Sequence, residues 1–384
     1  MPKGHRISII GAGIAGLTLG RCLQNKGIQS TIFEKARQST SRNSYGITLH
    51  SKFYQPLLKV LDLDETAFRK RIAVDAGIGG TGRVSGGKDA APDSRSFKAN
   101  KNLFEALLAE GLEVKWEHEL TSVEPLPGAV ELDFKNHNRH ASTFVIGADG
   151  PHSQVRRTIL PNADFTILPY ATYNGKRRIS RADWDREFAP AFNGGAVVEQ
   201  KINGTLLQIS LNSINDEEAS VNYVFSRAAK RSGEGDALFR PKREKTEAKD
   251  TPEELFTEVQ ALSNQLSGPF ATIFHSDAMK KDRLLNWLMR SLPINTSNLT
   301  KQAEEGIVLI GDAVHAEPIL GPGLGANESI EDAIALAEVL DAGKEVKLNK
   351  LYDRRGQAWQ TGIQEAERRI AEVHGVSSGG KASL

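Results

Sequence analysis

The chain has 384 residues, of which 39% are hydrophobic and 25% are charged, and its formal net charge is +1 at pH 7. This length exceeds the size at which one hydrophobic core usually stops growing, so we expect two domains or one domain with a large insertion. The near-zero net charge gives no electrostatic reason to expect nucleic acid or an anionic membrane as a partner.

The number of cysteines and histidines and the distribution of apolar residues indicate which kinds of site and location to expect. A single cysteine, Cys22, excludes an intramolecular disulfide framework and a cysteine metal cluster. No pair of histidines at i, i+4 with a nearby acidic residue suggests a metal site. The one long apolar-looking run is N-terminal, and its glycines and Arg21 fit a nucleotide-binding turn better than a membrane span. We therefore expect a cytoplasmic protein without a metal site or a membrane span.

The stretch from Ile7 to Leu23 combines an apolar run, a glycine-rich turn and a helical pattern. Its glycines, Gly11, Gly13 and Gly16, have the G-x-G-x-x-G spacing of a dinucleotide-binding strand, turn and helix. The first glycine permits the turn, the second lets the backbone approach a pyrophosphate, and the third lets helix and strand pack closely. The free N–H groups at the start of the helix are expected to bind phosphate.

A second strand, Ser30 to Phe33, ends in Glu34, which is followed by Lys35. An acidic residue at this place accepts hydrogen bonds from ribose hydroxyls and repels a 2′-phosphate, so FAD or NAD fits better than NADP. The alternative is a glycine-rich turn in an α/β protein that binds no ligand.

The next part of the chain alternates between strands, helices and turns. A polar loop precedes an alternating strand, 45–50, and a helix with apolar residues up to Leu61. The glycine-dense segment 71–87 indicates a turn-rich edge rather than a helix. A helix is expected over 101–109, and the segments 113–116 and either side of Pro127-Gly128 are expected to form a small sheet.

A change of pattern after residue 166 predicts an antiparallel sheet. Asn203-Gly204 is a strong hairpin signal between two alternating segments, 196–202 and 205–211, and 221–225 adds a further strand. The charged segment 227–250 is expected to be a solvated loop, with a functional basic patch as the alternative. Thr251 and Glu254 then have the spacing of a capping box at the start of a helix.

The last part of the chain returns to the nucleotide-binding pattern. A buried strand, 306–310, ends in Gly311-Asp312, a glycine-rich loop follows at 321–325, and two helices are expected over 327–340 and 350–374. We therefore predict a discontinuous FAD-binding domain, a substrate domain inserted into it, and a C-terminal helix and tail. The FAD-binding domain comprises 1–75, 100–165 and 300–348, the substrate domain comprises 76–99 and 166–299, and the C-terminal helix and tail comprise 349–384.

Three motifs carry a family resemblance: GAGIAG at 11–16, GADGPHSQVRR at 147–157 and GDAVHAEPILGPGLGAN at 311–327. In this order and spacing the chain resembles the class A flavin-dependent monooxygenases, the family of para-hydroxybenzoate hydroxylase. Within that family it is similar to monooxygenases that tailor natural products and to those that modify tetracycline. The resemblance covers nearly the whole chain and implies an α/β fold, with a Rossmann-like FAD-binding domain, an inserted antiparallel β-sheet substrate domain and a C-terminal helix.

The resemblance also implies which residues bind the cofactor. Asp312 follows a buried strand at the carboxyl edge of the sheet, where a carboxylate can accept a hydroxyl from the ribityl chain of FAD; the alternative is that it caps a turn. Asp149 is expected to support FAD and the approach of NAD(P)H together with Arg156, the alternative being a structural turn with a salt bridge. We assign to Gly325 the backbone amide that contacts the flavin, although this loop has one residue more than the family pattern. The remaining expected contacts are Lys35, Gly46, Ile47, Lys101, Pro318 and Ala326.

The expected function is that of a monooxygenase that binds FAD and uses NAD(P)H and O₂. The protein would insert one oxygen atom into a small aromatic or polyketide-like secondary metabolite by hydroxylation, epoxidation or a Baeyer–Villiger reaction. The alternatives are an FAD-dependent oxidase or reductase that inserts no oxygen, and a non-catalytic flavin-binding protein. Because FAD would carry the chemistry, we assign no catalytic side chain from the sequence. Neither the substrate nor the oligomeric state follows from the sequence.

Overall fold

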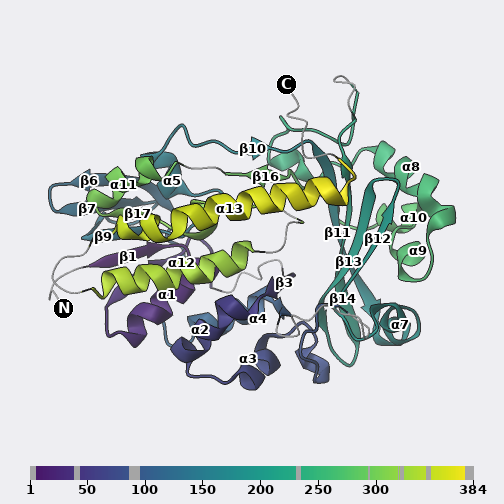
Figure 1. The fold of residues 1–384 in the computed structure, drawn as a ribbon, viewed down its shortest axis with the longest axis horizontal. Helices are drawn as coiled ribbons and strands as arrows, with labels where there is room; N and C mark the ends of the chain where they lie inside the picture. The colour runs from purple at the N-terminus through teal and green to yellow at the C-terminus, as the bar shows by residue number, and fades with distance from the viewer. Residues whose placement is uncertain are drawn as a thin grey trace.

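The computed structural model describes residues 6–38, 44–85, 96–230, 235–292, 295–318, 320, 324–342 and 347–376. In this part of the chain, no helix combines the length and the apolar character that crossing a membrane requires. Figure 1 shows two halves, one built around β1 with helices α1, α12 and α13, and one built around the long strands β11 to β14.

A five-stranded parallel sheet forms the centre of the first half, in the order β17-β9-β1-β2-β5. Strands β1 and β17 are buried along their whole length, and the carboxyl ends of β9 and β2 are also buried, as expected for a parallel sheet covered on both faces. The short strand near residue 114 pairs with β2 in this sheet, so our assignment of segment 113–116 to the small sheet was wrong. The strands are β1 (Ile7–Ile10), β2 (Ser30–Phe33), β5 (Val114–Lys115), β9 (Phe144–Gly147) and β17 (Ile307–Leu309).

Helices and two smaller sheets surround this centre, and α12 lies beside α1 and α13 (Figure 1). The strands β3 and β4 pair with each other, and β6, β7 and β8 form a separate antiparallel sheet. The helices are α1 (Ile14–Asn25), α2 (Ser51–Leu61), α3 (Glu65–Ile72), α4 (Lys101–Ala109), α5 (Gln154–Ile159), α11 (Thr296–Glu304), α12 (Gly325–Leu340) and α13 (Lys350–Val373). The strands are β3 (Gly46–Leu49), β4 (Phe97–Asn100), β6 (Leu120–Leu126), β7 (Ala129–Phe134) and β8 (His140–Ser142).

The second half is an antiparallel sheet in the order β12-β13-β14-β11-β15. Asn203 and Gly204 both have positive φ at the predicted hairpin, which confirms the turn signal. The two halves are also linked by the short pair β10 (Thr166–Ile167) and β16 (Arg290–Ser291). The strands of the large sheet are β11 (Tyr170–Ser180), β12 (Val197–Ile202), β13 (Thr205–Ile214), β14 (Glu218–Ala228) and β15 (Leu285–Asn286).

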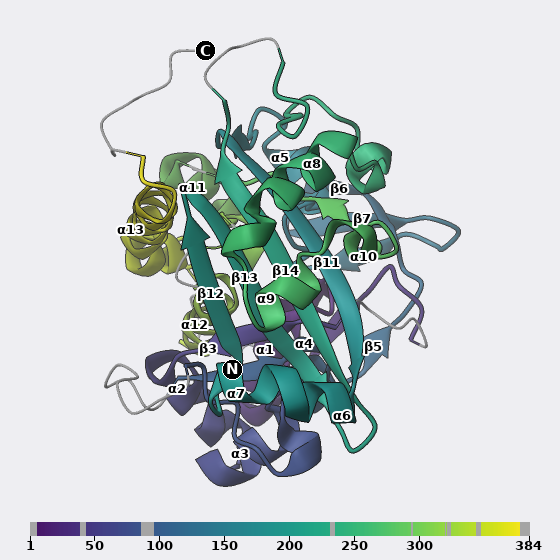
Figure 2. The same cartoon turned by 90° about the vertical axis from the view of Figure 1, so that its right-hand side faces the viewer.

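The two faces of the large sheet differ in chemistry. One face is apolar, with Tyr173, Leu207 and Phe225 in a core beneath helices, which Figure 2 shows in front of the sheet. The other face carries buried neutral polar groups, including Thr172 and Asn212, and lies toward the first half. The helices of this half are α6 (Arg181–Asp183), α7 (Ala189–Phe192), α8 (Glu253–Leu262), α9 (Pro269–Ile273) and α10 (Ser276–Met279).

Two local expectations for this half were wrong. The N-cap of α8 is Pro252, and no side chain caps the helix, so Thr251 and Glu254 form no capping box. The segment 227–250 is not wholly a solvated loop, because Arg227 is buried and forms ion pairs with Asp236 and Glu258. The described part of the glycine-dense segment, residues 71–85, contains the 3₁₀ turn 76–78 and isolated β-bridges at Ala73 and Arg83, in agreement with a turn-rich edge.

The C-terminal helix α13 contacts both halves of the molecule (Figure 1). Near its start, the Tyr352 hydroxyl accepts a hydrogen bond from the backbone N–H of Leu309 in β17. Near its end, His374 Nε2 lies 2.9 Å from the Ser226 hydroxyl of β14. This helix therefore links β17, at the edge of the parallel sheet, to β14, in the middle of the large antiparallel sheet.

A buried carboxylate on α12 joins α12, α13 and the turn after β17. Asp332 accepts hydrogen bonds from the Gly311 backbone N–H at 2.9 Å, from Arg355 Nε at 2.9 Å and from the Trp359 indole at 2.8 Å. Its other close neighbour is His315, with Nε2 at 2.6 Å. Burial alone would raise the pKa of Asp332, but His315 and Arg355 hold it below its usual value.

We predict that Asp332→Asn lowers the free energy of unfolding by about 3 kcal/mol, because it leaves the buried Arg355 with an incomplete set of partners. Urea unfolding followed by circular dichroism measures this change. The matched control is Asp341→Asn, which breaks the exposed ion pair with Lys26 and is expected to cost less than about 1 kcal/mol. Equal effects of the two substitutions would contradict the prediction.

Candidate functional site

The three glycine-bearing motifs meet at the start of α1. Gly11 has a φ of 107°, and a Cβ there would overlap the backbone oxygen of Ala148 in the second motif. Gly311 has a φ of 61°, and a Cβ there would lie 3.0 Å from Ala15 Cβ on α1. The carboxyl ends of β1, β9 and β17 are therefore adjacent, and this edge is where ligands of open α/β sheets bind.

Two glycines of the first motif have different surroundings. A Cβ on Gly16 would overlap the backbone oxygen of Gly11, so this glycine is required for the packing of α1 on β1. A Cβ on Gly13 would meet only Glu105 Oε1, at 3.8 Å. Gly13 is the N-cap of α1, with no side-chain cap and no acidic residue in the first turn. The open space and the uncapped N–H groups fit a pyrophosphate.

Glu34 lies at the end of β2 and is buried beside this helix start. Its Oε2 accepts a hydrogen bond from the Ala12 N–H at 2.8 Å, and its Oε1 accepts one from the Ala36 N–H at 3.0 Å. Lys35 is exposed. The structure therefore places the predicted ribose-binding carboxylate next to the first motif, while contacts of Glu34 and Lys35 with a nucleotide stay predictions.

The second motif forms a tight turn whose side chains bind mainly backbone groups. Asp149 Oδ2 accepts hydrogen bonds from the N–H groups of Gln154 at 2.6 Å and Val155 at 3.3 Å. Asp149 Oδ1 is buried and has no hydrogen-bond partner among the described residues. Burial raises the pKa of this carboxyl. A buried oxygen without a partner is costly, which fits a hydroxyl or amide donor from a bound cofactor.

Arg156 connects the second motif to the third. Its Nη1 donates to the Ala313 carbonyl at 2.8 Å and its Nη2 donates to the Pro151 carbonyl at 2.7 Å. The side chain is buried beneath Phe165, and its Nε has no partner among the described residues. Arg156 thus binds carbonyl groups rather than the Asp149 carboxylate, as the alternative of a structural salt bridge would require, and its contact with FAD stays a prediction.

The carboxylate of Asp312 lies close to the start of α12 and to Lys101. Asp312 Oδ1 is 3.5 Å from the position that a Cβ on Gly325 would take. Burial raises the pKa of Asp312, and the charges of His315 and Lys101 act in the opposite direction. Asp312 accepts no hydrogen bond from the described residues, whereas Lys101 forms an ion pair with Glu105 at 2.5 Å. A carboxylate that accepts no hydrogen bond from the described residues fits a hydroxyl donor such as the ribityl chain of FAD.

The remaining predicted contacts lie on β3 and around the third motif. Gly46 donates its N–H to Asn212 Oδ1 of β13 at 3.0 Å, and Ile47 follows it on β3. Pro318 is buried. Gly325 and Ala326 form the first turn of α12, which begins two residues earlier than expected. The loop residues Gly321 to Gly323 lie outside the described residues, so the amide that meets the flavin stays a prediction.

Sequence analysis missed Asp332. This residue fixes the Gly311 N–H and His315, and the available signal was an acidic residue within the buried stripe of α12.

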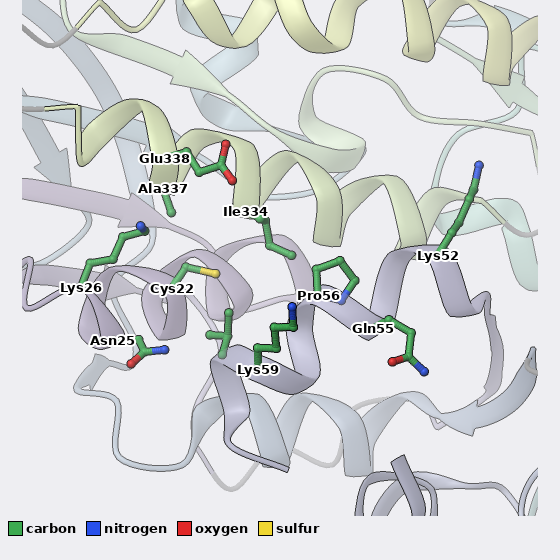
Figure 3. Close-up of a pocket in the computed structure, with 11 residues that line it drawn as sticks. Cys22, Asn25, Lys26, Lys52, Gln55, Pro56, Lys59, Ile334, Ala337 and Glu338 are labelled. Carbon is green, nitrogen blue, oxygen red and sulfur yellow. The ribbon is translucent and has the colours of Figure 1, made fainter. Parts of the chain in front are cut away.

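A large cavity lies elsewhere on the molecule. It has a volume of about 660 Å³ and opens between α1, α2 and α12 (Figure 3). Lys26, Lys59, Glu338 and Cys22 are among the residues that line it. None of the motif residues lines this cavity. We therefore place the candidate site at the meeting of the three motifs and not in this cavity.

Comparisons with known proteins agree with this geometry. Residues 9–52 match an NAD(P)-binding Rossmann-like domain, and residues 213–360 match an FAD binding domain. The chain is 31% identical over 390 residues to the FAD-dependent monooxygenase adaC of Aspergillus niger, covering 96% of this chain and 93% of the relative. The chain belongs to the FAD-dependent monooxygenase family. A second family member, the FAD-dependent monooxygenase nscC of Neosartorya fischeri, is 30% identical over 391 residues, covering 96% and 95%.

A solved structure shows the same fold for this monooxygenase. Klebsiella pneumoniae HpxO, complexed with FAD and uric acid, superposes with a TM-score of 0.71 at 15% identity, covering 98% of this chain and 90% of that one. The predicted fold class, family and FAD cofactor are confirmed. The open start of α1, the Asp149 oxygen without a partner and the carboxylate of Asp312 fit this cofactor.

We predict that Gly13→Ala and Gly16→Ala separate cofactor binding from packing. Gly13→Ala should keep the free energy of unfolding of the apoprotein within about 0.5 kcal/mol but lower FAD affinity, because its methyl group enters the open space. Gly16→Ala should lower that free energy by about 1–3 kcal/mol through overlap with the Gly11 backbone. Urea unfolding and fluorescence titration with FAD measure the two effects. A reversed pattern would contradict this assignment.

Glu317, after the third motif, is a further buried carboxyl. Burial raises its pKa from 4.5 to about 7, and the charges of Glu328, Asp312 and Glu365 act in the same direction while His315 opposes them. Gly362 on α13 makes room for it, since a Cβ there would lie 2.9 Å from Glu317 Oε1. Between pH 4.5 and about 7 the folded state binds more protons than the unfolded state, so this group lowers stability as the pH rises.

We predict that Glu317→Gln makes the protein more stable than wild type at pH 8, by on the order of 1–3 kcal/mol, and about equally stable near pH 4.5. Thermal unfolding across this pH range measures the difference. Glu304→Gln, at an exposed position on α11, is the control and should leave the pH profile unchanged. If the stability of Glu317→Gln depended on pH in the same way as that of wild type, Glu317 would not be the group with the raised pKa.

Proposed function

We propose that this FAD-dependent monooxygenase uses NAD(P)H and O₂ to insert one oxygen atom into a small aromatic or polyketide-like secondary metabolite. When bound, FAD supplies the redox chemistry. The proposal rests on one observation. The uncapped start of α1 lies beside the turn that carries Asp312, although these two motifs are far apart in the sequence. The names of the family members, which are FAD-dependent monooxygenases of fungi, support the reaction class.

In this proposal, several of the predicted contact residues hold the cofactor. The N–H groups after Gly13 bind the pyrophosphate, and Glu34 lies where it can accept ribose hydroxyls. Asp312 accepts a ribityl hydroxyl. The first turn of α12, at Gly325 and Ala326, favours negative charge on the flavin through its helix dipole. This stabilisation is worth roughly 0.3–1 kcal/mol at a surface and up to about 2 kcal/mol when partly buried.

The proposed substrate space lies between β3–β4 and the polar face of the large sheet. Gly46 and Asn212 mark the contact between these elements. In this proposal, a discontinuous domain binds FAD and an inserted domain binds the substrate, with the boundaries expected from the sequence. A cytoplasmic location is part of the proposal, because NAD(P)H is available there.

Three measurements on the purified protein test the proposal. We expect FAD to be bound, NADPH or NADH consumption to be accelerated by a substrate from a panel of hydroxylated aromatic compounds, and one atom from labelled O₂ to enter the product. The matched control is Asp312→Ala, which should bind FAD less tightly because it lacks the ribityl acceptor. Substrate oxidation without label would indicate an oxidase, and FAD binding without NAD(P)H consumption would indicate a non-catalytic flavin protein.

A further inference from the structure

The cavity between α1, α2 and α12 is lined by none of the motif residues, so the proposed function gives it no role (Figure 3). Its volume of about 660 Å³ lies within the range of roughly 300–1,000 Å³ that is typical of ligand pockets. A ligand in this cavity would not compete with FAD for the meeting of the three motifs. The cavity is therefore a candidate for a second binding site.

Apolar side chains from all three helices line this cavity. Cys22 of α1 and Ala337 of α12 are buried, and Val60 of α2 and Ile334 of α12 are half-buried. Pro56 lies inside α2, where its nitrogen carries no hydrogen for a helical hydrogen bond, and its ring adds apolar surface to the wall. A ligand with an apolar body can therefore remove apolar surface of three helices from water.

Lysine side chains give the cavity an excess of positive charge. Two of its charged lining residues are paired with residues outside the lining, Lys26 with Asp341 at 2.9 Å and Glu338 with Arg354 at 2.9 Å. The ammonium group of Lys59 has no ion-pair or hydrogen-bond partner within the part of the chain that the structure describes. Figure 3 shows this ammonium group directed toward α12. Lys59 is therefore available to an anionic group of a ligand.

The lining residues also indicate which kind of anion fits. Lys52 adds a second cation, and its Nζ lies 4.4 Å from the centroid of the Phe53 ring. No arginine is among the described residues that line the cavity, so it lacks the bidentate fork that favours phosphate. A small hydrated anion would leave the apolar wall uncovered. An organic carboxylate with an aromatic body uses both features, since ammonium groups are also attracted to the faces of aromatic rings.

We propose that this cavity is a second ligand site and that it binds an aromatic carboxylate. The carboxylate binds Lys59, and the rings lie against Cys22, Pro56 and Ile334. Burial of the rings supplies most of the affinity, and the lysine makes the site selective for the charged ligand over a neutral one of the same shape. No covalent bond forms, and FAD stays bound at the three motifs.

Isothermal titration of the FAD-loaded protein with 2-naphthoate and with 2-naphthamide, its neutral counterpart, tests the proposal. With wild type we expect the carboxylate to bind about tenfold more tightly than the amide. Lys59→Met should raise Kd for 2-naphthoate by about tenfold and leave Kd for 2-naphthamide unchanged, as expected for loss of a charge-assisted hydrogen bond. Lys59→Arg keeps the charge and should retain the preference. Ile334→Trp, which fills the cavity, should weaken binding of both compounds.

The matched control is Lys70→Met, at an exposed lysine on α3 outside the cavity, which should leave both Kd values unchanged. Failure of the wild type to bind 2-naphthoate would overturn the proposal. Unchanged binding to folded Lys59→Met would also overturn it, because the compound would then occupy another site. Equal losses in Lys59→Met and Lys70→Met would do so too, since they would indicate attraction by net charge alone. FAD content is measured on every preparation and should be the same for all variants.

Discussion

Close approach of backbones at glycine residues holds the three motifs together, and the rest of the site depends on it. Gly11 lets the turn after β1 lie against the second motif, and Gly311 lets the turn after β17 lie against α1. Any side chain at these positions would push apart the strand ends that form the binding edge. The positions of the Asp312 and Asp149 carboxylates follow from this contact, because each belongs to a turn that a glycine positions.

Some buried charged groups have a full set of hydrogen-bond partners and others do not. This difference distinguishes the groups that hold the fold together from those at the candidate site. Asp332 is surrounded by donors from two helices and the third motif, so its charge stabilises one arrangement of these elements. Asp312 and Asp149 lie where the three motifs meet, and each has a carboxylate oxygen without a partner among the described residues. Groups of the first kind fix geometry, whereas groups of the second kind are available to bind a ligand.

The sequence predicted those features that local signals determine. The strand, turn and helix at Gly11 and the Asn-Gly hairpin were found, because spacing and turn chemistry act over a few residues. Pairing between distant segments was harder to predict. Val114–Lys115 was assigned to the wrong sheet. Arg227 was expected in a solvated loop, because its partner Glu258 is far along the chain and no local signal connects the two. For the same reason, the order of the motifs located the Asp312 region but did not reveal the role of Asp332.

The helix α13 has a consequence for how the molecule is made. It joins β17 through Tyr352 and β14 through His374, and it follows every element that it connects in the order of synthesis. The strands of both sheets are therefore synthesised before α13, and the two contacts through which this helix ties one sheet to the other form only once it has been made and has docked.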